Sequence, residues 1–192
     1  SVKIIDESAF NRCLSLIKVV LPSSITRIDR FAFEDCFSLT TIQLYKSKEN
    51  KLLHSNDQFL YDFSIDNFAF KNCKSLIEIE IPPQITIIKE YAFYKCSSLS
   101  KVQLHNSITF IGYGAFSECP NIKIDQLSIP SKLTNIGFDI FTDDQNFYLF
   151  VDKIPTSFIA KDIYDLYIDD IEIGLVKIIV NKLNLNFDQD IK

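Results

Sequence analysis

The chain has 192 residues and a formal net charge of −5, and 47% of its residues are hydrophobic. This length and composition suffice for one continuous core. The acidic balance, with 20 basic residues scattered along the chain, argues against a nucleic-acid partner. No apolar run reaches the roughly 18 residues that a membrane span requires, so membrane insertion is not expected.

A phrase built around Ala-Phe recurs along the chain. Its phenylalanines are separated by 23, 37, 23, 23 and 25 residues, so the period is 23 with one insertion of about 14 residues, the excess of 37 over 23. Self-similarity at such a period is typical of a solenoid, in which each coil buries its apolar face only against its neighbours. We therefore expect about six coils with one core, anchored by Phe10, Phe33, Phe70, Phe93, Phe116 and Phe141.

Each coil contains a predicted strand after its Ser-Leu pair. In residues 75–82, the alternation of Leu76, Ile79 and Ile81 before a proline predicts a short strand that ends at the proline. Such strands, stacked in parallel, would form a ladder along one side of the coils. The Ile-x-x-Ile pair of residues 85–88, and its equivalents in other coils, is expected to pack inward from the opposite wall. Ala-Phe then supplies a small residue at a tight corner and a ring that fills the middle.

The cysteines recur once per coil, three residues after the anchoring phenylalanine. A metal site needs cysteines that converge on a point, and a disulfide needs side chains that face each other, whereas these residues are at least 23 positions apart and form a line. We therefore predict buried free thiols, weakly hydrogen-bonded to the backbone. They are Cys13, Cys36, Cys73, Cys96 and Cys119.

The solvent side of the strand ladder is one candidate for a partner-binding site. Its residues flank the central apolar position of each strand and carry mixed charge without aromatic anchors, which hot spots favour. The alternative is an ordinary solvated strand face. The candidate residues are Lys18, Gln43, Glu78, Glu80, Lys101 and Gln103.

The insertion at residues 45–61 is a second candidate. Its first half is polar and turn-forming, and its second half regains strand-like alternation. Insertions in solenoids map to loops on one face, often the binding face. Tyr45, His54, Phe59 and Tyr61 would supply aromatic contacts there, and the alternative is a hairpin whose rings only cover the neighbouring coil.

The last part of the chain departs from the repeat. After Pro155, apolar residues at helical spacing and then two or three strand-like runs predict a capping segment of mixed helix and strand at residues 159–192, which follows the repeats at 1–158. No equivalent cap is predicted before the first coil, so Ile4, Phe10 and Leu16 are expected to promote self-association. The first residues lack the basic and apolar regions of a signal peptide and match the middle of a repeat, so we expect a fragment with any targeting sequence upstream.

No catalytic constellation is recognisable in the sequence. There are two histidines and four glycines, and neither a nucleophile elbow nor a phosphate-binding loop occurs. We expect no enzymatic activity, no metal and no cofactor.

The full repeat carries a family resemblance. The phrase Ile-x-x-Ile-x-x-x-Ala-Phe-x-x-Cys-x-Ser-Leu-x-x-Ile-x-Ile-Pro resembles the BspA-like (Treponema pallidum type) leucine-rich repeats, over residues 1 to about 158. Tyr45 and His105 depart from it, because each replaces the expected proline. The resemblance implies a β-rich leucine-rich-repeat solenoid, a right-handed coil of about six 23-residue repeats with a parallel strand ladder, here followed by a C-terminal α+β cap.

Two functions from different classes follow. The resemblance implies a non-enzymatic protein-binding module, a surface antigen or adhesion protein that is secreted or held at the cell surface and binds a host or matrix protein. The alternative is a cytoplasmic scaffold or regulatory subunit, which the free cysteines favour, as does the absence of an Asn-x-Ser/Thr sequence. A third possibility is a spacer for a binding domain elsewhere.

Overall fold

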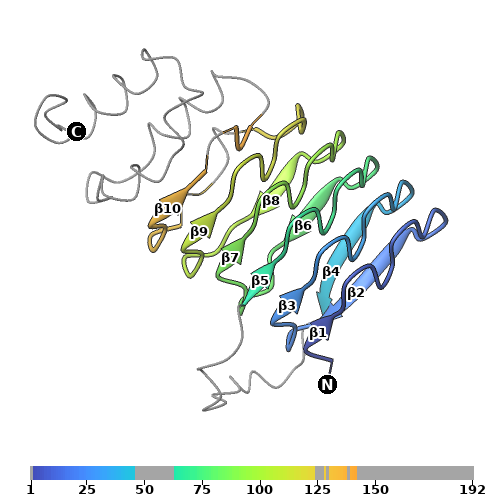
Figure 1. The fold of residues 1–192 in the computed structure, drawn as a ribbon, viewed down its shortest axis with the longest axis horizontal. Coiled ribbons are helices and arrows are strands. Elements are labelled where there is room, and N and C mark those ends of the chain that lie inside the picture. Colours follow the sequence, from blue (N-terminus) through green and yellow to red (C-terminus); the bar gives the residue numbers. More distant parts are fainter. Residues whose placement is uncertain (1, 46–62, 124–127, 129, 138, 142–192) are drawn as a thin grey trace, which may run out of the picture.

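A computed structural model of the chain describes residues 2–45, 63–123, 128, 130–137 and 139–141. In this part the chain folds as a parallel β-solenoid with two sheets on opposite walls of the coils (Figure 1), which confirms the predicted fold. The predicted insertion and capping segment lie outside the described residues, apart from Tyr45. Within that described part, no helix has the length and apolarity needed to cross a bilayer.

The predicted strand ladder is a four-stranded parallel sheet in the order β2-β4-β6-β8. Its register advances by one coil from strand to strand, pairing Lys18 with Thr41, Thr41 with Glu78, and Glu78 with Lys101. Central apolar residues such as Ile79 point inward and their neighbours point outward, as the alternation predicts. The strands are β2 (Lys18–Pro22), β4 (Thr41–Tyr45), β6 (Glu78–Glu80) and β8 (Lys101–Gln103).

The opposite wall is also a sheet, which the sequence analysis did not predict. Each Ile-x-x-Ile segment contributes a two-residue strand whose second residue is buried, as Ile28 and Ile88 are. Two residues are too few for an alternation to be recognised, so only their inward packing was visible in the sequence. In spatial order the strands are β1 (Ile4–Ile5), β3 (Arg27–Ile28), β5 (Ser64–Ile65), β7 (Ile87–Ile88), β9 (Phe110–Ile111) and β10 (Asn135–Ile136).

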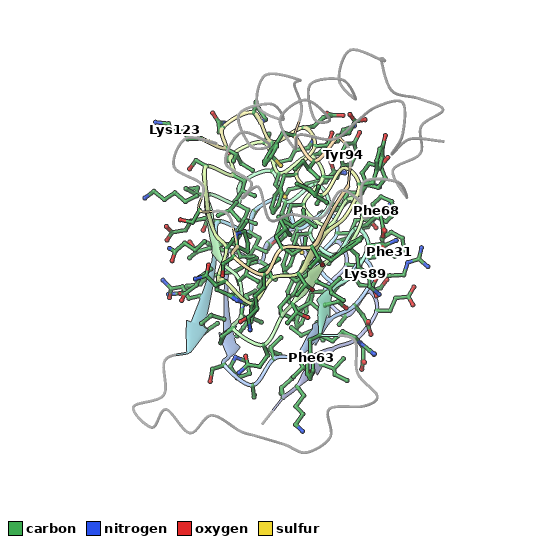
Figure 2. All side chains as sticks on the ribbon, turned by 90° about the vertical axis from the view of Figure 1, so that its left-hand side faces the viewer. Phe31, Phe63, Phe68, Lys89, Tyr94 and Lys123 are labelled. Carbon is green, nitrogen blue, oxygen red and sulfur yellow. The ribbon has the colours of Figure 1, made fainter. Side chains whose placement is uncertain are left out.

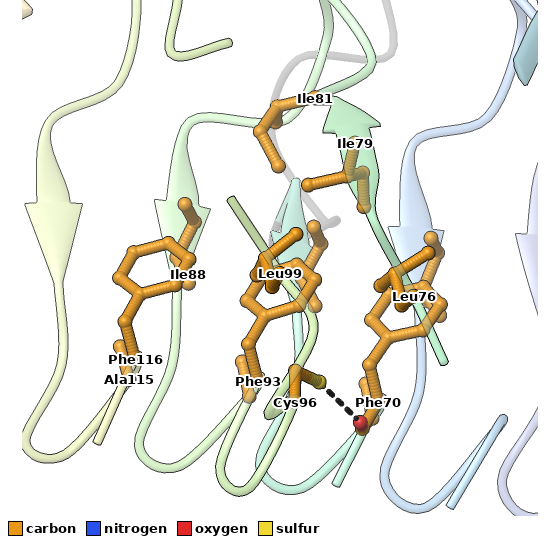
Figure 3. Packing of buried hydrophobic residues seen from close by; sticks show 14 of the residues in the cluster. Phe70, Leu76, Ile79, Ile81, Ile88, Phe93, Cys96, Leu99, Ala115 and Phe116 are labelled. Atoms are coloured by element: carbon orange, nitrogen blue, oxygen red, sulfur yellow. Dashed lines mark hydrogen bonds between the residues drawn. The ribbon is translucent and has the colours of Figure 1, made fainter. Parts of the chain in front are cut away.

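The anchoring phenylalanines form a continuous stack between the two sheets (Figure 3). The ring centroids of Phe33 and Phe70 lie 5.1 Å apart, as do those of Phe70 and Phe93, with planes within 4° of parallel. The stack therefore crosses the insertion without a gap, although 37 residues separate Phe33 from Phe70. The alanine before each ring is fully buried in the central coils, as a tight corner requires.

The thiols bind the coil that precedes them. Four of the five thiols donate to the carbonyl oxygen of the preceding anchor phenylalanine at 3.1 Å, as Cys96 does to Phe70 (Figure 3). All five cysteines are free, and four are buried as predicted, whereas Cys13 is only partly buried because no described coil precedes it. Burial raises the pKa of Cys36 to about 12 and raises that of Cys96 well above its usual range, so these thiols stay protonated. The other three such donors are Cys36, to Phe10, Cys73, to Phe33, and Cys119, to Phe93.

Candidate functional site

The outer face of the four-stranded sheet brings together four of the six residues predicted there. A hollow of about 210 Å³ opens on this face, over an apolar floor that includes Ile42 and Leu44. Lys101 lies on the same face in register with Glu78, and Lys18 lies on the edge strand in register with Thr41, so neither lines the hollow. The predicted residues that do line it are Gln43, Glu78, Glu80 and Gln103.

The hollow lies where two strands separate. β4 pairs with β2 along five residues, up to Tyr45, but it pairs with β6 only at Thr41 and Ile42. β6 ends at Glu80, which is paired with Gln103 of β8, so among the described strands the β6 side of residues 43–45 has no partner. The separation occurs directly before the insertion, which the chain must accommodate between β4 and the next coil.

The aromatic residues predicted in the insertion remain untested. Tyr45 is the last residue of β4, beside the hollow. His54, Phe59 and Tyr61 lie outside the described residues. Their role stays a prediction.

The structure shows an aromatic surface that the sequence analysis missed. Phe31 stacks on Phe68 with centroids 5.5 Å apart, and Phe68 stacks on Tyr91 at 5.2 Å. Tyr94 and Tyr113 meet the Tyr91 ring edge-on, at 5.4 and 5.1 Å. We call these five residues the corner stripe. Four of them follow the two-residue strands at the corner that leads to the anchor ring, and Tyr94 directly follows the anchor ring Phe93. Figure 2 shows Phe31, Phe68 and Tyr94 along one side of the molecule.

The stripe was visible in the sequence only as a weak repeat. An aromatic residue precedes Ala-Phe in three successive coils, at Phe31, Phe68 and Tyr91. These residues adopt positive φ angles of 56°, 60° and 55°, a conformation that is uncommon for bulky side chains. The positive φ turns the side chain out of the core, and this cannot be read from the period of the apolar residues.

Charged groups border the corner stripe. Lys71 lies over the Phe68 ring at 5.4 Å and forms an ion pair of 2.9 Å with Glu34. Hydrogen bonds with Tyr91 and with the carboxylate of Asp139 raise the pKa of Tyr113. The stripe is therefore an aromatic surface whose polar atoms are partly engaged with one another.

Near the C-terminal end of the stripe a second cation is held by its neighbours. The Lys95 ammonium lies 4.9 Å from the Tyr94 ring centroid and 3.7 Å from Glu118. A hydrogen bond with Tyr94 and the charge of Glu118 raise the pKa of Lys95. The Tyr94 hydroxyl itself donates to Glu118 at 2.7 Å.

Stacked parallel coils, a ladder of buried anchor rings and side chains displayed on outer faces define a class of repeat protein that presents surfaces to partners. A family model for the BspA type leucine-rich repeat region matches the chain in six copies, over residues 1–57 and 63–161. The chain belongs to this family of leucine-rich repeat proteins. Among the described residues, no group of three or more histidine, cysteine, aspartate or glutamate side chains could hold a metal ion.

Solved leucine-rich repeat structures are similar to the chain. That of a T. pallidum leucine-rich repeat protein is 30% identical, with a TM-score of 0.50 over 72% of this chain and 53% of that one. A Bacteroides ovatus leucine-rich repeat protein is 26% identical, with a TM-score of 0.49 over 73% and 38% of the two chains. One from Eubacterium ventriosum is 19% identical, with a TM-score of 0.52 over 71% and 33%.

The chain thus spans about half the length of the T. pallidum protein and less of the other two. No curated protein matches it.

Proposed function

We propose that the chain is a protein-binding module that takes its partner on the outer face of the four-stranded sheet. The observation that carries this proposal is the hollow between β4 and β6, where strand pairing stops and polar side chains surround an apolar floor. A binding face needs apolar area that can be buried and polar groups that fix the orientation of the ligand. The hollow combines both on an otherwise regular sheet.

The geometry suits an extended segment of the partner. Backbone groups of residues 43–45 face the gap left by β6, so an added strand could form main-chain hydrogen bonds there. The amides of Gln43 and Gln103 can each donate and accept, and the carboxylates of Glu78 and Glu80 can accept from the partner's N–H groups. The half-buried Leu44 would contact an apolar side chain of the segment.

More specifically, we propose that the chain acts as a surface antigen or adhesion protein whose ligand is a host or matrix protein. This role is supported by membership of the BspA type repeat family. The alternative, a cytoplasmic scaffold or regulatory subunit, is supported by the buried free thiols, which are typical of a reducing compartment. The compartment of the captured partner separates the two.

Charge reversal in the hollow tests the proposal. The intact chain, Glu80→Arg and the control Glu7→Arg, which makes the same change on the exposed first coil, would be compared for capture of proteins from matrix and whole-cell extracts. The partner is then confirmed with the purified protein. We expect Glu80→Arg to lose a partner that Glu7→Arg keeps. Equal capture by both variants, with unchanged unfolding curves, would overturn the sheet-face site.

A variant that lacks residues 45–61 provides a second test in the same capture experiment. The insertion begins beside the hollow, and its aromatic residues were predicted to bind. If the deletion loses the same partner as Glu80→Arg, the insertion and the hollow form one site. If the deletion retains it, the predicted role of His54, Phe59 and Tyr61 is wrong while the hollow stands.

The first coil supports a further proposal, self-association. Within the described part of the chain, its outward face exposes Phe10, Leu14 and Ile17, and β1 and β2 lie at the edges of their sheets. Sedimentation measured over a range of protein concentrations tests it. We expect Phe10→Asp to shift the distribution toward monomer, and a wild-type chain that stays monomeric at high concentration would rule it out.

A further inference from the structure

The corner stripe repeats a three-part arrangement of an aromatic ring, a carboxylate and a cation. In one copy the Lys71 ammonium lies 5.4 Å from the Phe68 ring centroid and 2.9 Å from Glu34. In a second copy the Lys95 ammonium lies 4.9 Å from the Tyr94 centroid and 3.7 Å from Glu118. In both, the cation is attracted by the ring face and by the carboxylate.

A third copy has the ring and the carboxylate only. The Tyr113 hydroxyl donates to Asp139 Oδ2 at 2.9 Å, and 41% of the Tyr113 surface is exposed. Among the described residues, no lysine or arginine lies over this ring. The position of the cation is therefore open to a group from outside the described part of the chain.

Gly114 occupies the position at which the row of stacked rings ends, one residue after Tyr113. In the two preceding coils the equivalent residue is aromatic and continues the stack, but a side chain on Gly114 would start with a Cβ 2.5 Å from Tyr91 Cε1. The Tyr91 ring thus covers the glycine and the stack ends there. Tyr113 packs against Tyr91 at an interplanar angle of 79° instead of joining the stack.

We infer that Tyr113 and Asp139 form a docking position for an arginine side chain on a basic segment of a partner protein. A guanidinium group is planar, stacks on aromatic rings and pairs with carboxylates through two parallel hydrogen bonds, so it satisfies both members at once. Tyrosine is enriched among residues that dominate binding energies. The net charge of −5 favours the approach of a basic partner. This site is separate from the sheet-face hollow and goes beyond the protein-binding role proposed above.

Titration of the 192-residue chain with a blocked Gly-Arg-Gly-Arg-Gly peptide tests the inference. Ring-labelled tyrosines, with the Tyr113 signals assigned from a Tyr113→Phe spectrum, would report binding at this position by NMR. Matched peptides with lysine or with uncharged citrulline in place of arginine measure the contribution of the planar group and of the charge. We expect the Tyr113 signals to shift with the arginine peptide, less with lysine and not with citrulline.

Two substitutions then measure the separate contributions of the carboxylate and the ring to binding of the arginine peptide. Asp139→Asn removes the charge and keeps a residue that tolerates the φ of 47°, and we expect it to weaken binding at least about tenfold. Tyr113→Leu removes the ring, with a loss of about three- to tenfold. The matched control is Asp35→Asn, the same change at another positive φ, where the carboxylate already pairs with Arg12. It should leave binding unchanged.

Three results would overturn the inference. The first is a 192-residue chain whose Tyr113 signals do not respond to the arginine peptide, which would mean that the position takes no arginine from a partner. The second is equal binding of the citrulline peptide. The third is an equal loss in Asp35→Asn and Asp139→Asn, which would indicate general electrostatic attraction. None of these results bears on Glu80→Arg, so the sheet-face proposal is tested independently.

Discussion

The first and third coils carry the same motif, Ala-Phe-x-x-Cys-x-Ser-Leu, but they differ in burial. In the third coil Phe70 is completely buried and the thiol of Cys73 donates to the coil before it. In the first coil 40% of Phe10 is exposed, and Cys13 is only partly buried. A residue in this solenoid is thus buried by its neighbouring coils and not by its own, so equal sequences have unequal energetic roles.

The largest expected effect is the contrast between two identical truncations. Phe70→Ala removes a ring that is stacked on both sides and should lower the free energy of unfolding by about 3–5 kcal/mol. Phe10→Ala removes a ring stacked on one side and should cost about 1–2 kcal/mol, because much of its surface is already in water. Urea unfolding followed by circular dichroism measures both, and equal losses would contradict the comparison.

A second contrast concerns the residue that follows each two-residue strand. In the third coil this residue is Asp66, whose side chain has room to pair with Lys89 at 3.2 Å. In the fifth coil it is Gly112, where a Cβ would lie 2.7 Å from the backbone nitrogen of Glu90. Gly112→Ala should therefore destabilise by about 1–3 kcal/mol, and Asp66→Ala by less than about 1 kcal/mol. Thermal unfolding of the two variants measures the difference, and a neutral Gly112→Ala would show that coils four and five are packed less tightly than described.

Thiol reactivity sharpens the comparison further. At neutral pH a thiol reagent should label Cys13 first, because the other four thiols are buried. The labelling rates of Cys36, Cys73 and Cys96 should follow opening of the coils and become fast only in denaturant. Mass spectrometry of timed samples measures the order. Simultaneous labelling of all five in native conditions would show that the central coils open as easily as the first.

The last expected effect is a pH dependence, which is confined to alkaline pH. The pKa of Cys36 rises from 9.0 to about 12 on folding because the thiol is buried, so the folded state holds a proton that the unfolded state releases. The stability from this thiol is fully present below pH 9 and is lost as the pH rises toward 12. Cys36→Ala should therefore lose less stability than the wild type between these pH values. Parallel slopes for the two proteins, measured by urea unfolding at each pH, would rule out the linkage.

Much of the fold was predictable because the repeated residue pattern directly indicates the structure of each coil. The 23-residue period predicts stacked coils, the alternation around residues such as Ile79 predicts the strand ladder, and the cysteine spacing predicts unpaired buried thiols. Four residues of the candidate site were predicted for the same reason, since alternation alone decides which side chains of a strand point outward. These features depend on the residue pattern within one repeat and on the similarity of the adjacent coils.

Only the tertiary structure decided where the surfaces differ from coil to coil. The hollow depends on β4 and β6 separating after Ile42, which is a relation between residues 37 positions apart. The corner stripe depends on positive φ angles that turn Phe31, Phe68 and Tyr91 outward, and its end depends on the space over Gly114. The sequence by itself determined the repeated coil, because each repeat meets the same apolar neighbour. The surfaces proposed for binding lie where that repetition is broken, and there non-local packing decides the geometry.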